Sequence, residues 1–217
     1  MLFSAIREND IRGVLELLNH GGYVDVNSKL ANGLTPLMMA VERSTFNDAL
    51  MVRALLTSPD VDVNMQDNRG FTALMMAVED DKLEAVEALL ADFRVNVNIR
   101  NNEGLAALSL AKSVDIANAL LADARVDVNI TNPYGWTPLM VALRAERLPI
   151  VKLLLENRRV NIDARDHNDL SALQLALDMG NNEAIRLFLA RIQFREIQNR
   201  QLSPLMSEAQ KSLWKRQ

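Results

Sequence analysis

The chain has 217 residues, a net charge of −4 and a pI of about 5.3, and it contains no cysteine. The acidic balance disfavours a domain that must neutralise many nucleic-acid phosphates, and the lack of cysteine excludes disulfides, thiolate catalysis and cysteine-ligated zinc. No apolar run reaches the roughly 18 residues of a membrane span and no signal-peptide pattern opens the chain, so we expect a soluble intracellular protein that binds neither nucleic acid nor membrane.

An eight-residue pattern recurs along the chain. It reads G-x-T-P/A-L-x-x-A at 33–40, 70–77 and 135–142, with degraded copies at 104–111 and 169–176. A second pattern, V-D/N-V/I-N/D, ends six positions before each copy, at Asn27, Asn64, Asn98, Asn129 and Asp163. The alanines that close the first pattern, with Ala5 upstream, are separated by 35, 37, 34, 31 and 34 residues. Such regular spacing predicts an array of repeated structural units.

Each first pattern predicts the start of a short inner helix. Thr35, Thr72 and Thr137 occupy the position where a capping hydroxyl is favoured, and Pro36 and Pro138 follow at the first helical position. Apolar residues then recur at helical spacing over 83–90 and 149–156, which predicts a longer outer helix with one buried face. A single unit of this kind cannot bury its apolar face, so we expect stability to come from stacked neighbours.

These motifs resemble the ankyrin repeat over about residues 1–190. The resemblance implies an all-α ankyrin-repeat solenoid of helix-turn-helix units with short β-hairpin-like turns. The expected domains are an array over 1–192 and a basic extension over 193–217. The six expected units of the array are 1–27, 28–64, 65–98, 99–129, 130–163 and 164–192.

Three departures from the family pattern have structural consequences. The family's T-P-L-H histidine is absent, and its position is held by Met38, Met75, Ser109, Met140 and Gln174. The glycine that usually follows the outer helix is mostly missing, so these helices must end without a left-handed glycine. The second unit carries an insertion that includes 44–47, and the fourth is three residues short. We expect the short unit to lose most of its inter-helix loop and to leave a notch.

Residues 191–217 carry six cations against two carboxylates, a net charge of +4. Ser203 and Pro204 form a helix start, and the apolar residues that would share one face of the helix are Leu205, Met206, Ala209 and Leu213. One interpretation is a C-terminal capping helix that covers the last repeat. The other is a basic tail that docks on an acidic partner or a membrane.

The sequence offers little material for catalysis. Its two histidines, His20 and His167, fall four units apart, and no phosphate-binding glycine loop or hydrolase motif occurs. We therefore expect no catalytic residue, no cofactor and no metal site.

In the ankyrin family, partners commonly contact the concave side formed by turn tips and inner helices. The residue after each turn glycine, or after Asp169 in the last unit, is apolar, which predicts an aligned ridge that faces either a partner or the neighbouring turns. With the charged and aromatic tips added, the expected partner-binding residues are Leu34, Arg69, Phe71, Arg100, Glu103, Leu105, Tyr134, Trp136, Arg144, Arg165 and Leu170.

The leading hypothesis is a non-catalytic scaffold, monomeric alone, that binds another protein through this face. A small cytoplasmic adaptor and a bacterial effector acting in the host cytosol both fit. The alternatives are a regulatory or chaperone-like component of a larger complex and a substrate for asparaginyl hydroxylation. The resemblance makes Asn64, Asn98 and Asn129 the candidate acceptors of that modification.

Overall fold

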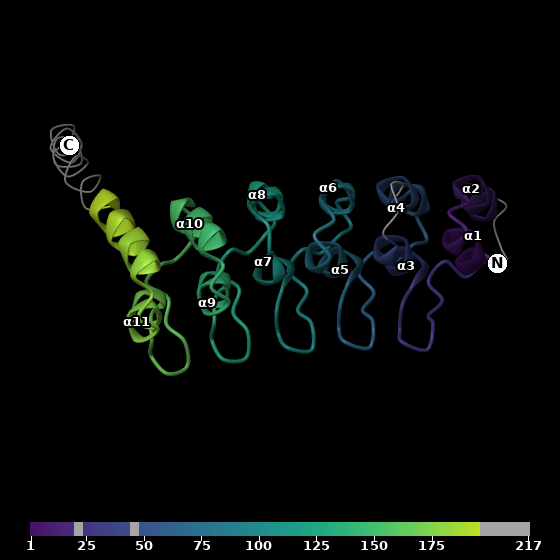
Figure 1. The fold of residues 1–217 in the computed structure, drawn as a ribbon. Coiled ribbons are helices and arrows are strands. Elements are labelled where there is room, and N and C mark those ends of the chain that lie inside the picture. Colours follow the sequence, from purple (N-terminus) through teal and green to yellow (C-terminus); the bar gives the residue numbers. More distant parts are fainter. Residues whose placement is uncertain (20–23, 44–47, 196–217) are drawn as a thin grey trace, which may run out of the picture.

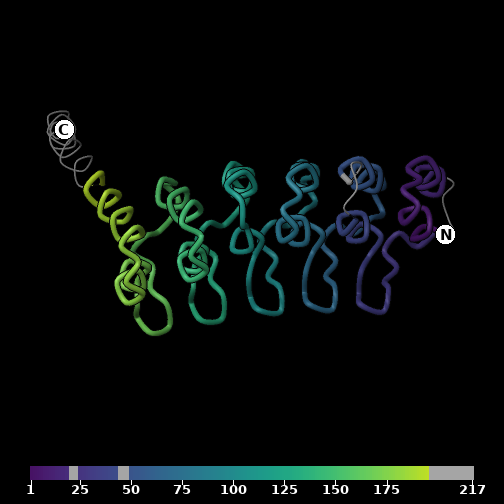
Figure 2. The backbone as a smooth tube through the Cα atoms, in the orientation of Figure 1, coloured from purple at the N-terminus to yellow at the C-terminus, as the bar shows by residue number. Residues whose placement is uncertain are grey.

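The computed structural model describes residues 1–19, 24–43 and 48–195, in which helices stack in two rows with turns projecting from one side (Figure 1). Each unit contributes one inner helix, next to the turns, and one outer helix (Figure 2). Within these ranges there is no strand, and the only β-pairing is a single antiparallel bridge between Arg165 and Ser171. The all-α solenoid predicted from the sequence is confirmed.

The helices alternate between the two rows. The inner helices are α1 Leu2–Arg7, α3 Pro36–Glu42, α5 Ala73–Glu79, α7 Ala107–Leu110, α9 Pro138–Arg144 and α11 Ala172–Asp178. The outer helices are α2 Ile11–Asn19, α4 Asp48–Leu56, α6 Leu83–Leu90, α8 Val114–Ala122 and α10 Leu148–Glu156. A further outer helix follows α11 over 182–195 and so continues past 192, while residues 196–217 lie outside the described part of the chain.

The predicted helix starts are confirmed. The hydroxyls of Thr35, Thr72 and Thr137 each accept a hydrogen bond from the backbone N–H three residues later. These bonds satisfy one of the N–H groups that a helix leaves unpaired at its start. Pro36 and Pro138 occupy the first helical position, where no N–H is needed.

The fourth unit differs from its expected form. Its inner helix α7 has four residues, whereas α5 and α9 have seven, yet three residues still separate α7 from α8, as three separate α5 from α6. The deletion therefore shortens the helix and leaves the loop intact. The loop is retained because Ser113 is needed to cap α8, where its hydroxyl accepts from the Ile116 N–H. The insertion at 44–47 lies outside the described residues.

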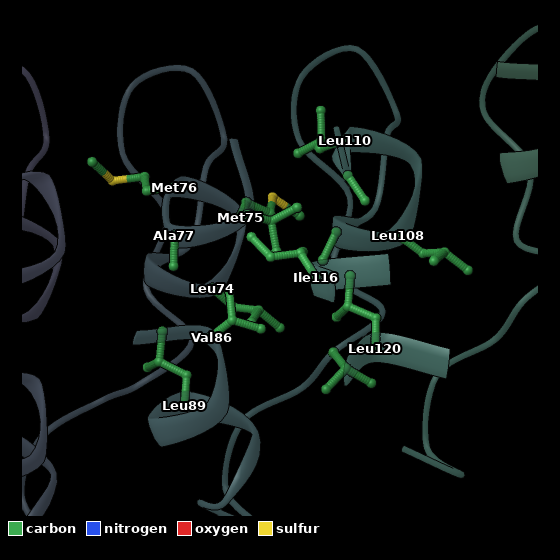
Figure 3. Close-up of a cluster of buried hydrophobic side chains, with 14 of the residues drawn as sticks. Leu74, Met75, Met76, Ala77, Val86, Leu89, Leu108, Leu110, Ile116 and Leu120 are labelled. Atoms are coloured by element: carbon green, nitrogen blue, oxygen red, sulfur yellow. The ribbon is translucent and has the colours of Figure 1, made fainter. Parts of the chain in front are cut away.

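Apolar side chains of adjacent units interdigitate to form one continuous core. Between units 3 and 4, side chains of α5 and α6 face those of α7 and α8 (Figure 3). Met38, Met75 and Met140, which replace the family histidine, are all almost fully buried. An unbranched side chain can fill such a gap without a hydrogen-bond partner.

The turns stack through close backbone contact. The Asn68 N–H donates to the Asn32 carbonyl, and the Asn102 N–H donates to the Arg69 carbonyl. Gly70 adopts φ 79°, and a Cβ placed on it would lie 2.7 Å from the Asn102 nitrogen. Glycine is thus required both by its backbone conformation and by the approach of the following turn.

Asparagine side chains tie each unit to the next. The Asn64 amide donates to the Arg94 carbonyl at 2.8 Å, and its oxygen accepts from the Asn96 N–H at 2.7 Å. The same donor and acceptor pairing recurs at Asn27, Asn98 and Asn129. The three asparagines considered as hydroxylation acceptors therefore each bridge two units.

Arginines from the following unit complete the outer helices. The Arg94 guanidinium donates to the Leu56 carbonyl at the end of α4, at 2.9 Å, and to the Ser58 carbonyl. Arg125 and Arg159 repeat this contact at the ends of α6 and α8. The last carbonyls of a helix have no partner within the helix. These arginines supply the hydrogen-bond donors that a turn at a C-terminal glycine would otherwise provide.

A parallel set of cations completes the inner helices. Lys82 donates to the Val41 and Glu42 carbonyls of α3, Lys112 donates to the Glu79 carbonyl of α5, and Arg147 donates to carbonyls at the end of α7. The positive charges also lie at helix C-termini, where the helix dipole favours them. Two rows of cations thus join units 2 to 5.

Replacing Arg125 with alanine is expected to lower the free energy of unfolding by about 2 kcal/mol, because the carbonyls of Leu90, Asp92 and Val95 all lose a charged donor. The control is Arg53→Ala on α4, an exposed arginine whose side chain makes no hydrogen bond within the described ranges. Urea unfolding followed by circular dichroism measures both. Equal losses in the two variants would contradict the capping role.

Acid should weaken the same contacts. The side-chain hydrogen bonds from Arg94 and Arg125 hold the pKa values of Asp92 and Asp123 below their usual range, against the opposing effect of burial. A carboxyl whose pKa is lower in the folded than in the unfolded state stabilises the fold fully above the unfolded-state pKa, which is about 3.9 for aspartate. This stabilisation is lost as the pH falls through the folded-state pKa. Asp92→Asn should therefore flatten the loss of stability in acid, whereas Asp60→Asn, at an exposed carboxylate, should not.

Candidate protein-binding surface

The junction between units 4 and 5 departs from the regular pattern in two ways. The inner helix α7 is short here. In units 3, 4 and 6 one turn residue donates its backbone N–H to the preceding turn, and these residues are Asn68, Asn102 and His167. In unit 5 the equivalent residue is Pro133. Proline has no N–H to donate. Within the described chain the Glu103 carbonyl receives no hydrogen bond, so the turn-to-turn hydrogen bond found at the neighbouring junctions is missing here.

A groove of about 620 Å³ lies at this junction, and we call it the Trp136 groove. Its apolar lining comes from Leu105, Pro133, Tyr134, Trp136, Val141 and Ala145, and its polar lining from Asn102, Glu103, Asn132 and Arg144. Glu103 belongs to unit 4 and Arg144 to unit 5, so each unit contributes one charge of opposite sign.

The turn of unit 5 fixes the indole of Trp136. The Asn132 side-chain oxygen accepts from the Tyr134 and Trp136 N–H groups, both at 3.0 Å, which holds the turn closed. The indole N–H donates to an Asp166 carboxylate oxygen at 3.2 Å, across the junction with unit 6. Trp136 is half-buried and packs against the core, so its ring is held by a hydrogen bond on one edge and by apolar contacts on the other.

Asp166 is buried, and several groups keep it charged. Burial by itself raises the pKa of this carboxyl. The N–H groups of Leu170 and Asn168 and the indole of Trp136 outweigh that effect and lower the pKa below its usual range. A charged acceptor strengthens the bond that positions the indole.

Two side chains contact the indole ring of Trp136. The Tyr134 ring lies 4.9 Å from the Trp136 ring at 31°, and Tyr134 is itself exposed. The Arg144 guanidinium lies 4.2 Å from the indole centroid, in a cation–π contact. Within the described chain the Arg144 side chain has no hydrogen bond or ion pair, so its N–H donors face solvent.

Unit 3 contains a related cluster with a different charge balance. The Arg69 guanidinium lies 4.3 Å from the Phe71 ring and pairs with Asp67 at 3.4 Å and Glu79 at 3.6 Å. Glu79 occupies the helix position that Arg144 holds in unit 5. The cation over Phe71 is thus neutralised within the unit, whereas the cation over Trp136 is not.

The apolar ridge could face either a partner or the neighbouring turns, and two of its members pack inside the protein. Leu34 and Phe71 are buried, because the backbone after the glycine directs these side chains inward against the core. Leu105, Trp136 and Leu170 are half-buried and also pack against it. The ridge therefore serves packing along the array and is open to solvent only in part, towards its C-terminal half.

The structure gathers five of the predicted residues in the Trp136 groove: Glu103, Leu105, Tyr134, Trp136 and Arg144. The others lie elsewhere. Arg69 and Phe71 form the unit 3 cluster, Arg100 is exposed on the turn of unit 4, and Arg165 pairs with Asp169 at 3.2 Å in unit 6. Leu34 and Leu170 pack within units 2 and 6.

Sequence reasoning did not identify Asn132, Pro133 and Val141 as lining residues. Pro133 carried a usable signal, because a proline at a position that donates to the preceding turn in other units predicts a broken contact. The short fourth unit was a second signal at the same junction. Val141 could not be identified, since its equivalents Met39 and Met76 are buried.

No other chemistry is prominent in the described ranges. They contain no group of three or more His, Asp or Glu side chains placed to hold a metal ion. His167 is exposed in the turn of unit 6, and His20 lies outside the described residues. None of the helices in the described part is long and apolar enough to cross a membrane.

Comparison with known proteins supports the repeat assignment. A sequence profile of ankyrin repeats (three copies) matches residues 2–101, 43–130 and 104–201. The ankyrin repeat domain of Bcl-3, described as a unique member of the IkappaB family, superposes with a TM-score of 0.80 at 26% identity over 88% of this chain and 85% of that one. No curated protein sequence matches the chain.

Two further solved structures are similar. The ankyrin repeat protein EF0377 gives a TM-score of 0.76 at 26% identity, covering 87% of this chain and 96% of its own. An ankyrin repeat domain from Acinetobacter baumannii AYE gives 0.74 at 26% identity, covering 88% and 96%.

Removing the acceptor for the indole should loosen unit 6. Asp166→Asn is expected to cost about 1 kcal/mol of unfolding free energy and to keep the turn, because asparagine already closes the turns of units 4 and 5 at Asn101 and Asn132. Asp67→Asn in unit 3, where the ring has no N–H, is the matched control and should cost less.

A double-mutant cycle with Trp136→Phe isolates the indole bond. The loss caused by Asp166→Asn should largely vanish in the Trp136→Phe background. Fully additive losses in urea unfolding would show that the two side chains are not coupled.

Proposed function

Because the chain belongs to the ankyrin-repeat family, whose repeats are generally protein–protein interaction modules, we propose that it is a non-catalytic scaffold that binds a partner protein in the Trp136 groove. The observation that carries the proposal is the interruption of the array between units 4 and 5. At this junction an apolar lining occurs together with the Glu103 carbonyl and the Arg144 guanidinium, and within the described ranges neither of these two groups has a hydrogen bond or an ion pair.

The groove suits an extended segment of a partner. An N–H group of that segment can donate to the Glu103 carbonyl, in place of the N–H that Pro133 lacks. An apolar side chain can lie against Leu105 and Trp136, where a rigid aromatic surface provides large contact area.

The charges of the groove define the polarity of this segment. A partner carboxylate pairs with Arg144 on the unit 5 side, where the guanidinium is already oriented by the indole. The Glu103 carboxylate on the unit 4 side favours a partner cation or N–H group. A segment with the reverse arrangement of charges would meet like charges on both sides and bind less well.

The remaining predicted residues have two roles in the proposed binding surface. Arg100 and Arg165 are exposed on neighbouring turns and extend the contact along the array. Leu34, Arg69, Phe71 and Leu170 act indirectly, because they support the turns that present the surface. The proposal also includes an adaptor or effector role inside a cell, for a chain that is monomeric alone and contains no cysteine.

Selection of a random-peptide display library on the whole chain tests the proposal. Selected peptides should combine an apolar residue with a nearby carboxylate. Tyr134→Ala and Arg144→Ala should each weaken their binding at least about tenfold, equivalent to about 1.4 kcal/mol. Both residues are exposed, so these changes should leave the unfolding midpoint unchanged.

Two exposed residues on the outer-helix side serve as matched controls. Phe93→Ala removes an exposed aromatic ring and Arg158→Ala removes an exposed guanidinium, and both should bind the peptides as the parent does. The proposal fails if the selected peptides bind the Tyr134 and Arg144 variants as tightly as the parent.

A further inference from the structure

The last unit presents an apolar face that the other units cover. Leu143 and Leu155 of unit 5 have 0% and 2% of their surface exposed, because unit 6 packs on them. The equivalent residues of unit 6, Leu177 and Leu189, are 54% and 55% exposed. With the half-buried Leu173 and Ile185 they form a continuous surface over α11 and the helix at 182–195, which we call the terminal flank.

The turn of unit 6 is not built to receive another repeat. Asp169, with φ 62°, stands where the four preceding turns have glycine. In those turns a Cβ would lie within 3 Å of the following turn, whereas the Asp169 side chain is 84% exposed. An element that covers the terminal flank would therefore contact the helices and not the turn.

Polar residues also replace the contacts that a seventh repeat would need. Gln174, which is exposed, holds the position of the buried Met75 and Met140, and its side chain closes a capping box with Ser171. Asn181 holds the position of Lys82 and Arg147, and its side chain caps the helix of its own unit by accepting from the Ala184 N–H. Both changes fit a unit that ends the array.

We propose that residues 203–217 of this chain form a helix that packs across the terminal flank. This segment opens with the Ser203–Pro204 helix start and has apolar residues at 205, 209 and 213, one helical face of period four. Fifteen residues of helix span about 22 Å, and the seven residues at 196–202 can reach about 23 Å from the end of the helix at 182–195. The segment is thus long enough to fold back on the flank.

A cap of this kind lacks a turn, which agrees with Asp169 in the position of the glycine. It also removes the surface on which a second copy of the chain could stack.

Hydrogen exchange of the full chain, read by mass spectrometry on peptides from 203–217, tests the proposal. These peptides should be protected in the parent. Leu177→Lys combined with Leu189→Lys should accelerate their exchange at least about tenfold, because lysines cannot be buried in the contact. The control is Leu50→Lys on α4, a leucine of the same 54% exposure, which should leave the exchange unchanged.

Protection of α5 to α8 shows in each variant that the array itself is folded. The proposal is overturned if the 203–217 peptides exchange at the unprotected rate in the parent, or if the flank variant leaves their rate unchanged. It is also overturned if light scattering finds a dimer that the flank variant converts to a monomer, because the flank then binds a second copy.

Discussion

The carbonyls at the helix ends of units 2, 3 and 4 are satisfied by cations of the following unit, and the array from unit 2 to unit 5 depends on these contacts. Arg94, Arg125 and Arg159 complete outer helices, while Lys82, Lys112 and Arg147 complete inner ones. A helix end left unpaired in a packed junction costs free energy, so units 2, 3 and 4 each depend on the unit that follows. Packing and hydrogen bonding therefore act on the same unit-to-unit interface.

The junction of units 4 and 5 lacks part of this regular set of contacts. At the junction of units 4 and 5 the Arg147 and Arg159 contacts remain, but the turn bond is lost to Pro133 and the inner helix is one turn short. The cations therefore still join the helices of the two units, and the groove lies on the turn side of the junction.

The two ends of the groove are coupled to different parts of the fold. Tyr134 and Arg144 are exposed and depend on the groove alone, whereas Trp136 is tied to Asp166 in unit 6. A partner that contacts the indole therefore contacts the junction that attaches the last unit. Binding and the docking of unit 6 share one side chain, which links the surface to the stability of the C-terminal end.

The sequence by itself determined the repeat, the helix starts at Thr35, Thr72 and Thr137, and the position of Trp136 in its turn, because these follow from local pattern and backbone chemistry. Leu34 and Phe71 show the limit of that reasoning. Their slot is apolar in every unit, and an apolar residue in a turn suits a partner or a neighbour equally well. Only the tertiary structure decided that these two are buried, that the deletion shortens α7, and that, within the described residues, Arg69 pairs with two carboxylates while Arg144 pairs with none. The burial depends on contacts with other units, the shortened helix on the cap that Ser113 provides for α8, and the ion pairs of Arg69 on the direction of its side chain. None of these is encoded in the spacing of a repeat.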